Sequence, residues 1–550
     1  MGAGAAGFAV FFRWLIAILT RALTGYNDYT EHIGEPHPAF PSLGVWFLVL
    51  APVVAGLVYG PLVHFFAREA RGHGVPEVMF AVQKRGGRIA PQVAVVKALA
   101  SALCIGGGGS VGREGPIVQI GSALGSTFGG ILRVTEPRRR VLVACGAAGG
   151  IAATFNAPLA GVFFAMELIL ADFTAEAFGM VVLASVTSSV IGRAILGDSP
   201  FLTLPGFQVT DWREFFFFAL LGVIAGGVGV LFTKVLYWFE DVADALWKWP
   251  EWLRPAVGGI LLGLLLLVLP QMYGVGYPIL ANGVTGQYVL WFLLVLVVGK
   301  IVATSLSIAI GGSGGVFAPS LFMGAMLGSA FGIIASYVSP SIAGSPGAYA
   351  LVGMGAVFAG AARAPITAVI IMFELTGEYS IILPLMAAIV LAAGISHRLT
   401  PDTIYTLKLR RRGIDINAKT PPPRPSLGSL RAVMKPLPKG IDASTPLVDA
   451  AARLSRTPYG VLPVANVDGS YLGILTARAV AEALADGEHD TEKAAIMTEL
   501  PATVKEGDTI EKAVQALNLS GCGGIPVFGS EGGEPVGWLT YRDALAALRS

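Results

Sequence analysis

The chain has 550 residues, of which 54% are apolar, only 13% are charged and 71 are glycine, and its mean hydropathy is +0.68. A composition this apolar excludes an ordinary soluble globular protein and indicates a polytopic membrane protein. The net charge of +2 excludes the basic excess of a nucleic-acid-binding protein, so no nucleic-acid partner is expected. The three cysteines have no metal-ligand spacing, and no metal site is expected.

Charge is distributed unevenly along the chain. Of the 74 charged residues, 33 lie in residues 408–550 and 41 in the 407 residues before them. This difference implies two solvents, with lipid around the first four hundred residues and water around the rest.

The first four hundred residues contain a series of apolar stretches that predict membrane helices. The N-terminal stretch, which includes Arg13 and Arg21, lacks the order of a cleavable signal peptide and is expected to be the first helix. Several later stretches are shorter than the roughly 20 residues that a spanning helix needs, and many contain Gly and Pro. Broken helices are tolerated only inside protein or beside a wet cavity, which favours a transporter or channel. The later stretches are 43–66, 93–109, 116–132, 141–170, 177–197, 214–239, 255–273, 288–310, 316–338, 348–375 and 380–396.

The membrane part contains an internal repeat. The motifs at 112–116 and 315–319 are each followed by two glycines and a phenylalanine at the same spacings from the proline, with an offset of 203 residues. Interrupted segments at matching positions of two halves point to a binding site at the repeat interface. A second pair of motifs has an offset of 207 residues: Ala157-Pro158 with Glu167, and Ala364-Pro365 with Glu374.

Three breaks rich in Gly and Pro precede helical stretches, at 72–76, 112–116 and 314–319. In each, Gly allows a sharp backbone turn and Pro suits the first turn of a helix, which leaves unpaired N–H groups at the helix start. Such a start binds anions, because its donors and the positive end of the helix dipole face the same point. Together the breaks predict an anion path; tight helix packing through Gly is the alternative interpretation.

Glu114 lies within the second break, at membrane depth, where a carboxylate is costly unless it has a function. An anionic side chain aimed at an anion site competes with the anion and leaves the site when it is protonated. Glu114 is therefore expected to be a gate and a proton acceptor. A salt bridge to Arg113 is the alternative.

These motifs resemble those of the CLC family of chloride channels and proton-coupled chloride transporters. GREGP at 112–116, GGVFAP at 314–319, the G-x-G-x-P break at 72–76 and NAPLAG at 156–161 occur in the family's order and spacing, over nearly the whole chain. The resemblance implies an all-α polytopic membrane domain of the CLC fold, with an inverted-topology repeat and broken helices. It also implies a homodimer in the cell membrane, with one pore per subunit and with chloride and protons as substrates.

The resemblance assigns roles to particular residues. Glu114 corresponds to the external gating glutamate, the amides of Val316 and Phe317 to donors to the central anion, and Tyr405 to the hydroxyl donor near the internal mouth. Arg113 and Lys97 resemble the basic residues that shape the potential of the path. The anion-binding set expected from the breaks and the family is His73, Gly74, Gly112, Arg113, Gly115, Val316, Phe317 and Tyr405.

Two departures from the family pattern concern function, and the first is His73, which stands where the family usually has Ser. A neutral imidazole donates one hydrogen bond and an imidazolium donates two. Chloride affinity or flux is therefore expected to rise on acidification. A His73 side chain that is turned toward a neighbouring helix is the alternative.

The second departure follows the NAPLAG motif. Proton-coupled members typically carry two consecutive glutamates there, the second being the internal proton acceptor, whereas here Glu167 is followed by Leu168. Because Leu carries no proton, passive or weakly proton-coupled chloride conduction is the leading hypothesis. A chloride/proton antiporter with another proton route, such as His73, is the alternative. Glu167 and its repeat mate Glu374 are interpreted as paired carboxylates at helix ends.

The region after the last apolar stretch is basic, with nine Lys or Arg residues and one acid between 408 and 439. The positive-inside rule places this end in the cytoplasm. The membrane domain is expected to span 1–409 and a Pro-rich linker 410–430. The rest of the chain resembles a pair of α/β CBS domains, at 431–486 and 494–549.

Each CBS copy is predicted to have a short strand at Met434 or Met497, a helix, a Pro-containing strand, and a Gly-apolar-apolar-Thr segment that leads a helix. In nucleotide-binding members this Thr and a following Asp hold ribose and phosphate. The second copy keeps both, as Thr540 and Asp543. The first keeps Thr476 but has Ala in place of the Asp. At most one adenine-nucleotide site is expected, and a structural dimerisation module is the alternative.

The sequence therefore predicts CLC-type anion transport regulated by a cytoplasmic CBS pair, with no enzyme activity and no required cofactor. A metal-dependent enzyme would need a cluster of ligands that the six scattered histidines do not provide. A CBS-based nucleotide sensor with a non-transporting membrane domain is the alternative from another class. Intact Glu114, Tyr405 and both Gly-rich breaks argue against it.

Overall fold

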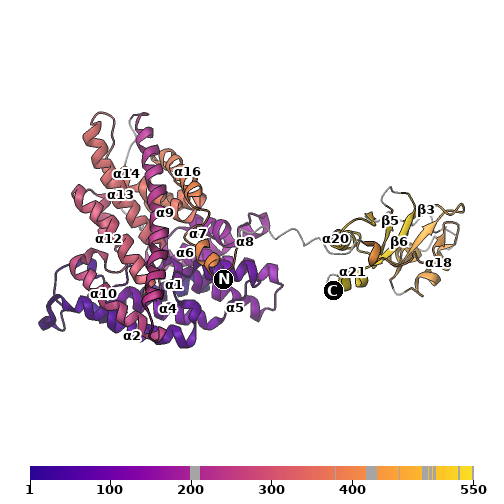
Figure 1. The fold of residues 1–550 in the computed structure, drawn as a ribbon, viewed down its shortest axis with the longest axis horizontal. Helices are drawn as coiled ribbons and strands as arrows, with labels where there is room; N and C mark the ends of the chain where they lie inside the picture. The colour runs from indigo at the N-terminus through magenta and orange to yellow at the C-terminus, as the bar shows by residue number, and fades with distance from the viewer. Residues whose placement is uncertain are drawn as a thin grey trace. The chain divides into compact units, whose positions relative to one another are not determined.

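The computed structural model describes residues 1–197, 211–377, 379–415, 430–457, 459–485, 494, 498, 503–529 and 533–547. The chain divides into two compact units, Met1–Ile416 and Asn417–Ser550 (Figure 1). Most of the predicted linker and the predicted strand at Met497 lie outside the described residues.

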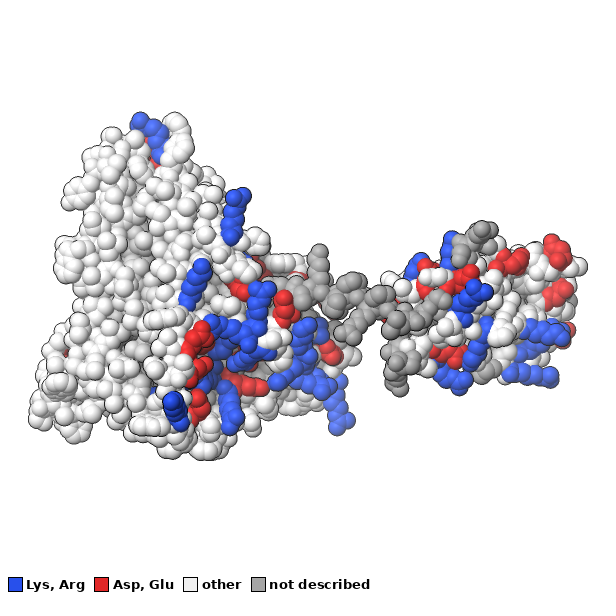
Figure 2. Space-filling model, in the orientation of Figure 1, with Lys and Arg blue, Asp and Glu red and all other residues white. Residues whose placement is uncertain are grey.

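The regular elements of the described part of unit 1 are helices. Eight are long and apolar enough to cross a membrane, and four shorter apolar helices accompany them. Figure 2 shows a largely uncharged surface on the visible face of this unit, with most of its charged residues gathered in one area. The α-helices are α1 (Gly2–Thr24), α2 (Phe47–Phe66), α3 (Val75–Lys84), α4 (Pro91–Gly106), α5 (Glu114–Ile131), α6 (Glu136–Phe155), α7 (Pro158–Phe164), α8 (Ala175–Leu196), α9 (Glu214–Leu246), α10 (Arg254–Val268), α11 (Tyr277–Val284), α12 (Leu290–Ala309), α13 (Phe317–Val338), α14 (Pro346–Ala362), α15 (Pro365–Thr376), α16 (Ile382–Leu399) and α17 (Thr406–Arg411).

Every predicted apolar stretch contains a helix, and two stretches contain two. The stretches 141–170 and 348–375 are each interrupted, between α6 and α7 and between α14 and α15. The residues that end α6 and α14, Asn156 and Arg363, both adopt left-handed backbone conformations, with φ of 56° and 52°. The two interruptions are 207 residues apart, as the repeat predicts. The short helices α3 and α11 were not among the predicted apolar stretches, but α3 confirms the helix start predicted at the 72–76 break.

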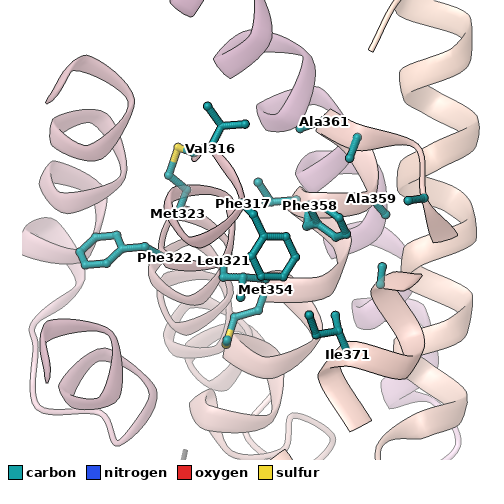
Figure 3. Packing of buried hydrophobic residues seen from close by; sticks show 14 of the residues in the cluster. Val316, Phe317, Leu321, Phe322, Met323, Met354, Phe358, Ala359, Ala361 and Ile371 are labelled. Atoms are coloured by element: carbon teal, nitrogen blue, oxygen red, sulfur yellow. The ribbon is translucent and has the colours of Figure 1, made fainter. Parts of the chain in front are cut away.

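The repeat also appears in helix packing, since α5 packs against α6 and α13 packs against α14. A Cβ atom on Gly121 would lie 2.1 Å from the carbonyl oxygen of Gly146, and one on Gly324 would lie 2.3 Å from that of Gly353. The repeated glycines after each proline therefore allow these helices to approach closely. In the second pair, the Phe317 ring lies edge-on to Phe358, with centroids 4.6 Å apart (Figure 3).

Unit 2 contains two copies of one small α/β arrangement. In each, the first strand is parallel to the second and the second is antiparallel to the third. The predicted Pro-containing strands are confirmed as β2 and β5. At Met434 the structure has no strand, but the next residue, Lys435, forms an isolated bridge with Trp538. The elements are β1 (Ile441–Asp442), α18 (Leu447–Leu454), β2 (Val461–Ala465), β3 (Tyr471–Thr476), α19 (Ala477–Ala485), β4 (Val504–Lys505), α20 (Ile510–Ser520), β5 (Gly524–Phe528), β6 (Pro535–Thr540) and α21 (Tyr541–Ala547).

Candidate functional site

The three Gly-rich breaks meet inside unit 1. Gly112 and Gly315 pair through two backbone hydrogen bonds, of 2.7 and 2.6 Å, in which each amide donates to the other carbonyl. The Gly72 amide donates to the Gly312 carbonyl at 3.0 Å, and the Gly314 amide donates to the Gly72 carbonyl at 3.3 Å. The starts of α3, α5 and α13 are therefore brought together from segments far apart in the sequence.

Two fully buried lysines hold the segments that precede α3 and α11. Lys97 Nζ donates to the carbonyls of Ala70 and Gly72, at 2.9 and 2.7 Å. Lys300 Nζ donates to the two carbonyls of residues 274–275, at 3.3 and 3.1 Å. The lysines are 203 residues apart, so the repeat offset identifies Lys300 as the mate of Lys97, although Lys300 was not among the predicted site residues. Lys97 thus holds the first break in place with its hydrogen bonds.

Glu114 is the first residue of α5 and is only 3% exposed. Its Oε1 accepts a hydrogen bond from the Tyr277 hydroxyl at 3.0 Å. Its Oε2 accepts a longer one, of 3.4 Å, from the amide of Ala318 in the first turn of α13. The carboxylate therefore lies at the start of α13, where an anion would meet unpaired amides. The Arg113 guanidinium lies over the Tyr277 ring, 5.1 Å from its centroid.

Val316 and Phe317 stand at the same helix start. Val316 is the residue before α13 and Phe317 is its first residue, so no carbonyl of the helix is available to their amides. Gly74 precedes α3 with φ of +81°. A Cβ atom on Gly112 would lie 1.9 Å from Glu114 Oε2, and one on Gly115 would lie 2.1 Å from the His73 carbonyl oxygen. Gly112 therefore allows close packing against the Glu114 carboxylate, and Gly115 allows the start of α5 to approach the backbone at His73.

His73 is fully buried and faces two tyrosines. Its Nε2 lies 3.4 Å from the Tyr237 hydroxyl oxygen, and its ring centroid lies 5.9 Å from that of Tyr405, which is also buried. The Tyr237 hydroxyl donates its hydrogen to the Ile404 carbonyl at 2.6 Å, so it can only accept from His73. This assigns the hydrogen of a neutral His73 ring to Nε2. Nδ1 has no hydrogen-bond partner among the described residues.

Two cavities border this group of side chains. One, of about 370 Å³, is lined by Arg13, Arg113 and Tyr277, among others. Tyr277 connects it to Glu114, and Tyr237 connects the other cavity to His73. Polar side chains therefore extend inward from both cavities toward the helix starts. The second cavity, of about 490 Å³, is lined by Arg68, Arg71, Tyr237, Glu240, Asp241, Asp244, Lys408, Arg411 and Arg412.

Glu167 and Glu374 cap helices in opposite halves of the repeat. Glu374 accepts from the amides of residues 159–160, at the start of α7, at 2.9 and 2.6 Å. Glu167 accepts from the amides of residues 366–367, at the start of α15, at 3.2 and 2.8 Å, and from the Thr367 hydroxyl at 2.7 Å. The interpretation of these residues as paired carboxylates at helix ends is confirmed. Leu168, beside Glu167, is buried.

In unit 2, Thr540 and Asp543 contact each other at the start of α21. The Thr540 hydroxyl donates to one Asp543 carboxylate oxygen at 2.6 Å, and Lys435 Nζ donates to the other at 2.8 Å. Burial raises the pKa of Asp543, but the hydrogen bonds from Lys435 and Thr540 outweigh burial and lower the pKa below its usual value. In the first copy, the Thr476 hydroxyl accepts from the Ala479 amide at 3.1 Å. Within the described residues, no group of His, Cys, Asp and Glu could hold a metal ion.

Comparison with known proteins identifies relatives of both units. The family described as "Voltage gated chloride channel" matches residues 55–397, and the "CBS domain" family matches residues 430–486 and 493–550. The H(+)/Cl(-) exchange transporter ClcA of Vibrio parahaemolyticus is 37% identical over 360 residues, which cover 64% of this chain and 76% of the relative. The putative chloride channel protein ClcB-like of Ralstonia nicotianae is 33% identical over 375 residues, which cover 67% of this chain and 87% of the relative.

Solved structures show the same fold. A slow cyanobacterial Cl⁻/H⁺ antiporter is 26% identical, with a TM-score of 0.67, over 75% of this chain and 96% of the other. A eukaryotic CLC transporter is 20% identical, with a TM-score of 0.64, over 98% of this chain and 96% of the other, so its fold extends across both units. The membrane helices, the CBS pair and the family match over more than half of the chain lead to one conclusion. This chain is a member of the CLC family of chloride channels and transporters, which are not enzymes, and it carries two C-terminal CBS domains.

Proposed function

We propose that this protein carries chloride across the membrane through the polar group between the two cavities, with Glu114 as the gate and proton acceptor. The observation that carries the proposal is the Glu114 carboxylate at the start of α13, 3.4 Å from the Ala318 amide. A carboxylate in that place occupies an anion site. When it is protonated it loses its charge and leaves, and chloride takes its place at the amides of Val316 and Phe317.

Other residues complete the proposed path. The Tyr405 hydroxyl donates to the anion on the far side of the gate, and His73 donates to it from Nδ1 when the ring is protonated. Gly74, Gly112 and Gly115 allow the helix starts to surround the anion. Arg113 and Lys97 contribute positive charge. Residues 1–409 form the transport domain in this proposal, and a linker over 410–430 joins it to CBS domains at 431–486 and 494–549.

Leu168 supports passive or weakly proton-coupled conduction, because it supplies no internal proton acceptor. The exchangers among the relatives support the alternative, an antiporter in which His73 relays the proton. Liposomes that contain the purified protein and a chloride gradient separate the two. Chloride flux without proton movement indicates a channel, proton movement in fixed proportion to chloride indicates an exchanger, and the absence of chloride flux would support the sensor alternative and overturn the proposal.

Replacing His73 by serine is expected to remove part of the pH dependence of chloride flux. The Nε2 hydrogen of His73 is directed at Tyr237, so a proton on Nδ1 would give the buried ring a charged donor to the anion, which a serine hydroxyl cannot gain. Chloride flux measured from about pH 4 to pH 8 should rise on acidification less steeply in His73→Ser than in wild type, mainly at the acidic end, because burial disfavours the charged ring. A variant with an unchanged pH profile would show that His73 is not an anion ligand.

We propose a cytoplasmic CBS pair with one adenine-nucleotide site, at Thr540 and Asp543 of the second copy. Asp543→Asn is expected to weaken binding of ATP or AMP to the full protein about tenfold or more, since it removes a charged acceptor. Asp508→Asn is the matched control, because Asp508 likewise accepts from a lysine, Lys512, at 2.8 Å. If wild type binds neither nucleotide, the dimerisation alternative for the CBS pair is correct.

A homodimer in the cell membrane, with one path per subunit, completes the proposed assembly. The family resemblance supports this assembly. The charge of the chain after the last membrane helix, where nine of ten charged residues between 408 and 439 are basic, supports the cytoplasmic position of the CBS pair.

A further inference from the structure

The start of α11 brings a tyrosine to the gate. Gly276, at φ +85°, adopts a left-handed conformation that favours glycine, and Tyr277 follows as the first residue of the helix. The Tyr277 hydroxyl donates to Glu114 Oε1 at 3.0 Å, the shorter of the two hydrogen bonds described above for this carboxylate. Tyr277 lies 203 residues after Gly74, which is the offset of the repeat, so the starts of α3 and α11 correspond to each other in the two halves.

Tyr277 stands between the 370 Å³ cavity and the buried gate. Its half-buried side chain lines the cavity, whereas Glu114 is 3% exposed. The Arg113 guanidinium, which also lines the cavity, lies over the phenol ring and limits its movement. The hydroxyl is thus held at the point where the carboxylate would have to pass from the helix start toward the cavity.

The other charged or titratable groups around Glu114 come from several elements. Arg113 lies on the same segment, Lys300 on α12 is close enough to interact electrostatically, and Tyr405 interacts from the start of α17. Lys300 binds the carbonyls of residues 274–275, directly before the α11 start, and so supports Tyr277 as well.

We propose that Tyr277 is a positioning residue for the gate: its hydroxyl holds the Glu114 carboxylate in the anion site and sets the pH at which chloride displaces it. This inference rests on the proposed function of Glu114. A hydroxyl that donates to a carboxylate stabilises the charged form more than the protonated form. Tyr277 therefore keeps the gate occupied at neutral pH, and protonation of Glu114 weakens the hydrogen bond and frees the side chain.

The test is the pH profile of chloride flux in liposomes. Tyr277→Phe keeps the ring and removes the donor, so half-maximal flux should move to higher pH by about one unit, the size expected for one hydrogen bond to a charged group. Tyr288→Phe is the control, because this substitution also removes a tyrosine hydroxyl close to α11. The Tyr288 hydroxyl accepts from Asn282 at 3.5 Å. The profile of Tyr288→Phe should coincide with that of wild type.

A second background shows whether Tyr277 acts through the gate. In Glu114→Gln, where the gate no longer titrates, adding Tyr277→Phe should leave the pH profile unchanged. A Tyr277→Phe shift of the same size in both backgrounds, or no shift in the wild-type background, overturns the inference. Absence of chloride flux in wild type overturns the proposed function instead, so the two failures are distinguishable.

Discussion

Replacing Glu114 by glutamine is expected to abolish any proton movement and to remove the pH dependence of chloride flux, except for the part that His73 contributes. Glutamine has nearly the shape of glutamate and can still accept from the Tyr277 hydroxyl, but it carries no charge and takes up no proton. It therefore imitates the protonated gate at every pH. Any chloride-driven proton flux should fall to background, and the rise of chloride flux between about pH 7.5 and pH 4.5 should shrink to the part that His73 contributes.

The control for this substitution is Glu136→Gln. Glu136 is also in the first turn of a helix in unit 1, α6, but it is exposed and pairs with Arg140 at 2.5 Å. Its removal should leave both fluxes at the wild-type level. If Glu114→Gln retained a steep pH dependence, another group would be the titrating gate. His73, buried beside Tyr405, would be the first candidate.

The sequence contains most of the information for the membrane fold, because it carries the repeat twice. Motifs 203 residues apart located the starts of α5 and α13. The matching Ala-Pro pairs indicated the repeat, but only the structure shows that α7 and α15 begin at Pro158 and Pro365. Apolar content alone did not reveal α3 and α11. They have only 10 and 8 residues, and stretches of this length have no membrane-spanning signal.

Contacts across the repeat were harder to predict than the elements. Tyr277 and Glu114 are 163 residues apart, and no spacing rule connects a hydroxyl on one short helix to a carboxylate on another. The interpretation of Glu167 as a helix-end carboxylate was right about its type of contact. Only the structure shows that the helix capped by Glu167, α15, lies in the other half of the repeat, and that Glu374 in turn caps α7.

Replacing Gly115 by alanine is expected to eliminate chloride flux and to lower the melting temperature of the protein. A Cβ atom there would lie 2.1 Å from the His73 carbonyl oxygen and 3.0 Å from Gly315 Cα, and both are backbone atoms that cannot rotate away. The starts of α3 and α5 must therefore separate. Overpacking of this kind costs roughly 1–3 kcal/mol, more than the roughly 0.5–1 kcal/mol that alanine gains over glycine within a helix.

Gly130→Ala is the matched control, because it makes the same exchange in the same helix at a position where a Cβ atom would meet nothing within 4 Å. Alanine should there retain its helix-forming advantage, so the melting temperature should stay level or rise and chloride flux should be unchanged. The comparison separates the effect of alanine on α5 from the effect of crowding at the meeting point of the breaks. If Gly115→Ala melted and transported like Gly130→Ala, the close approach of α3, α5 and α13 would not be required for the anion path.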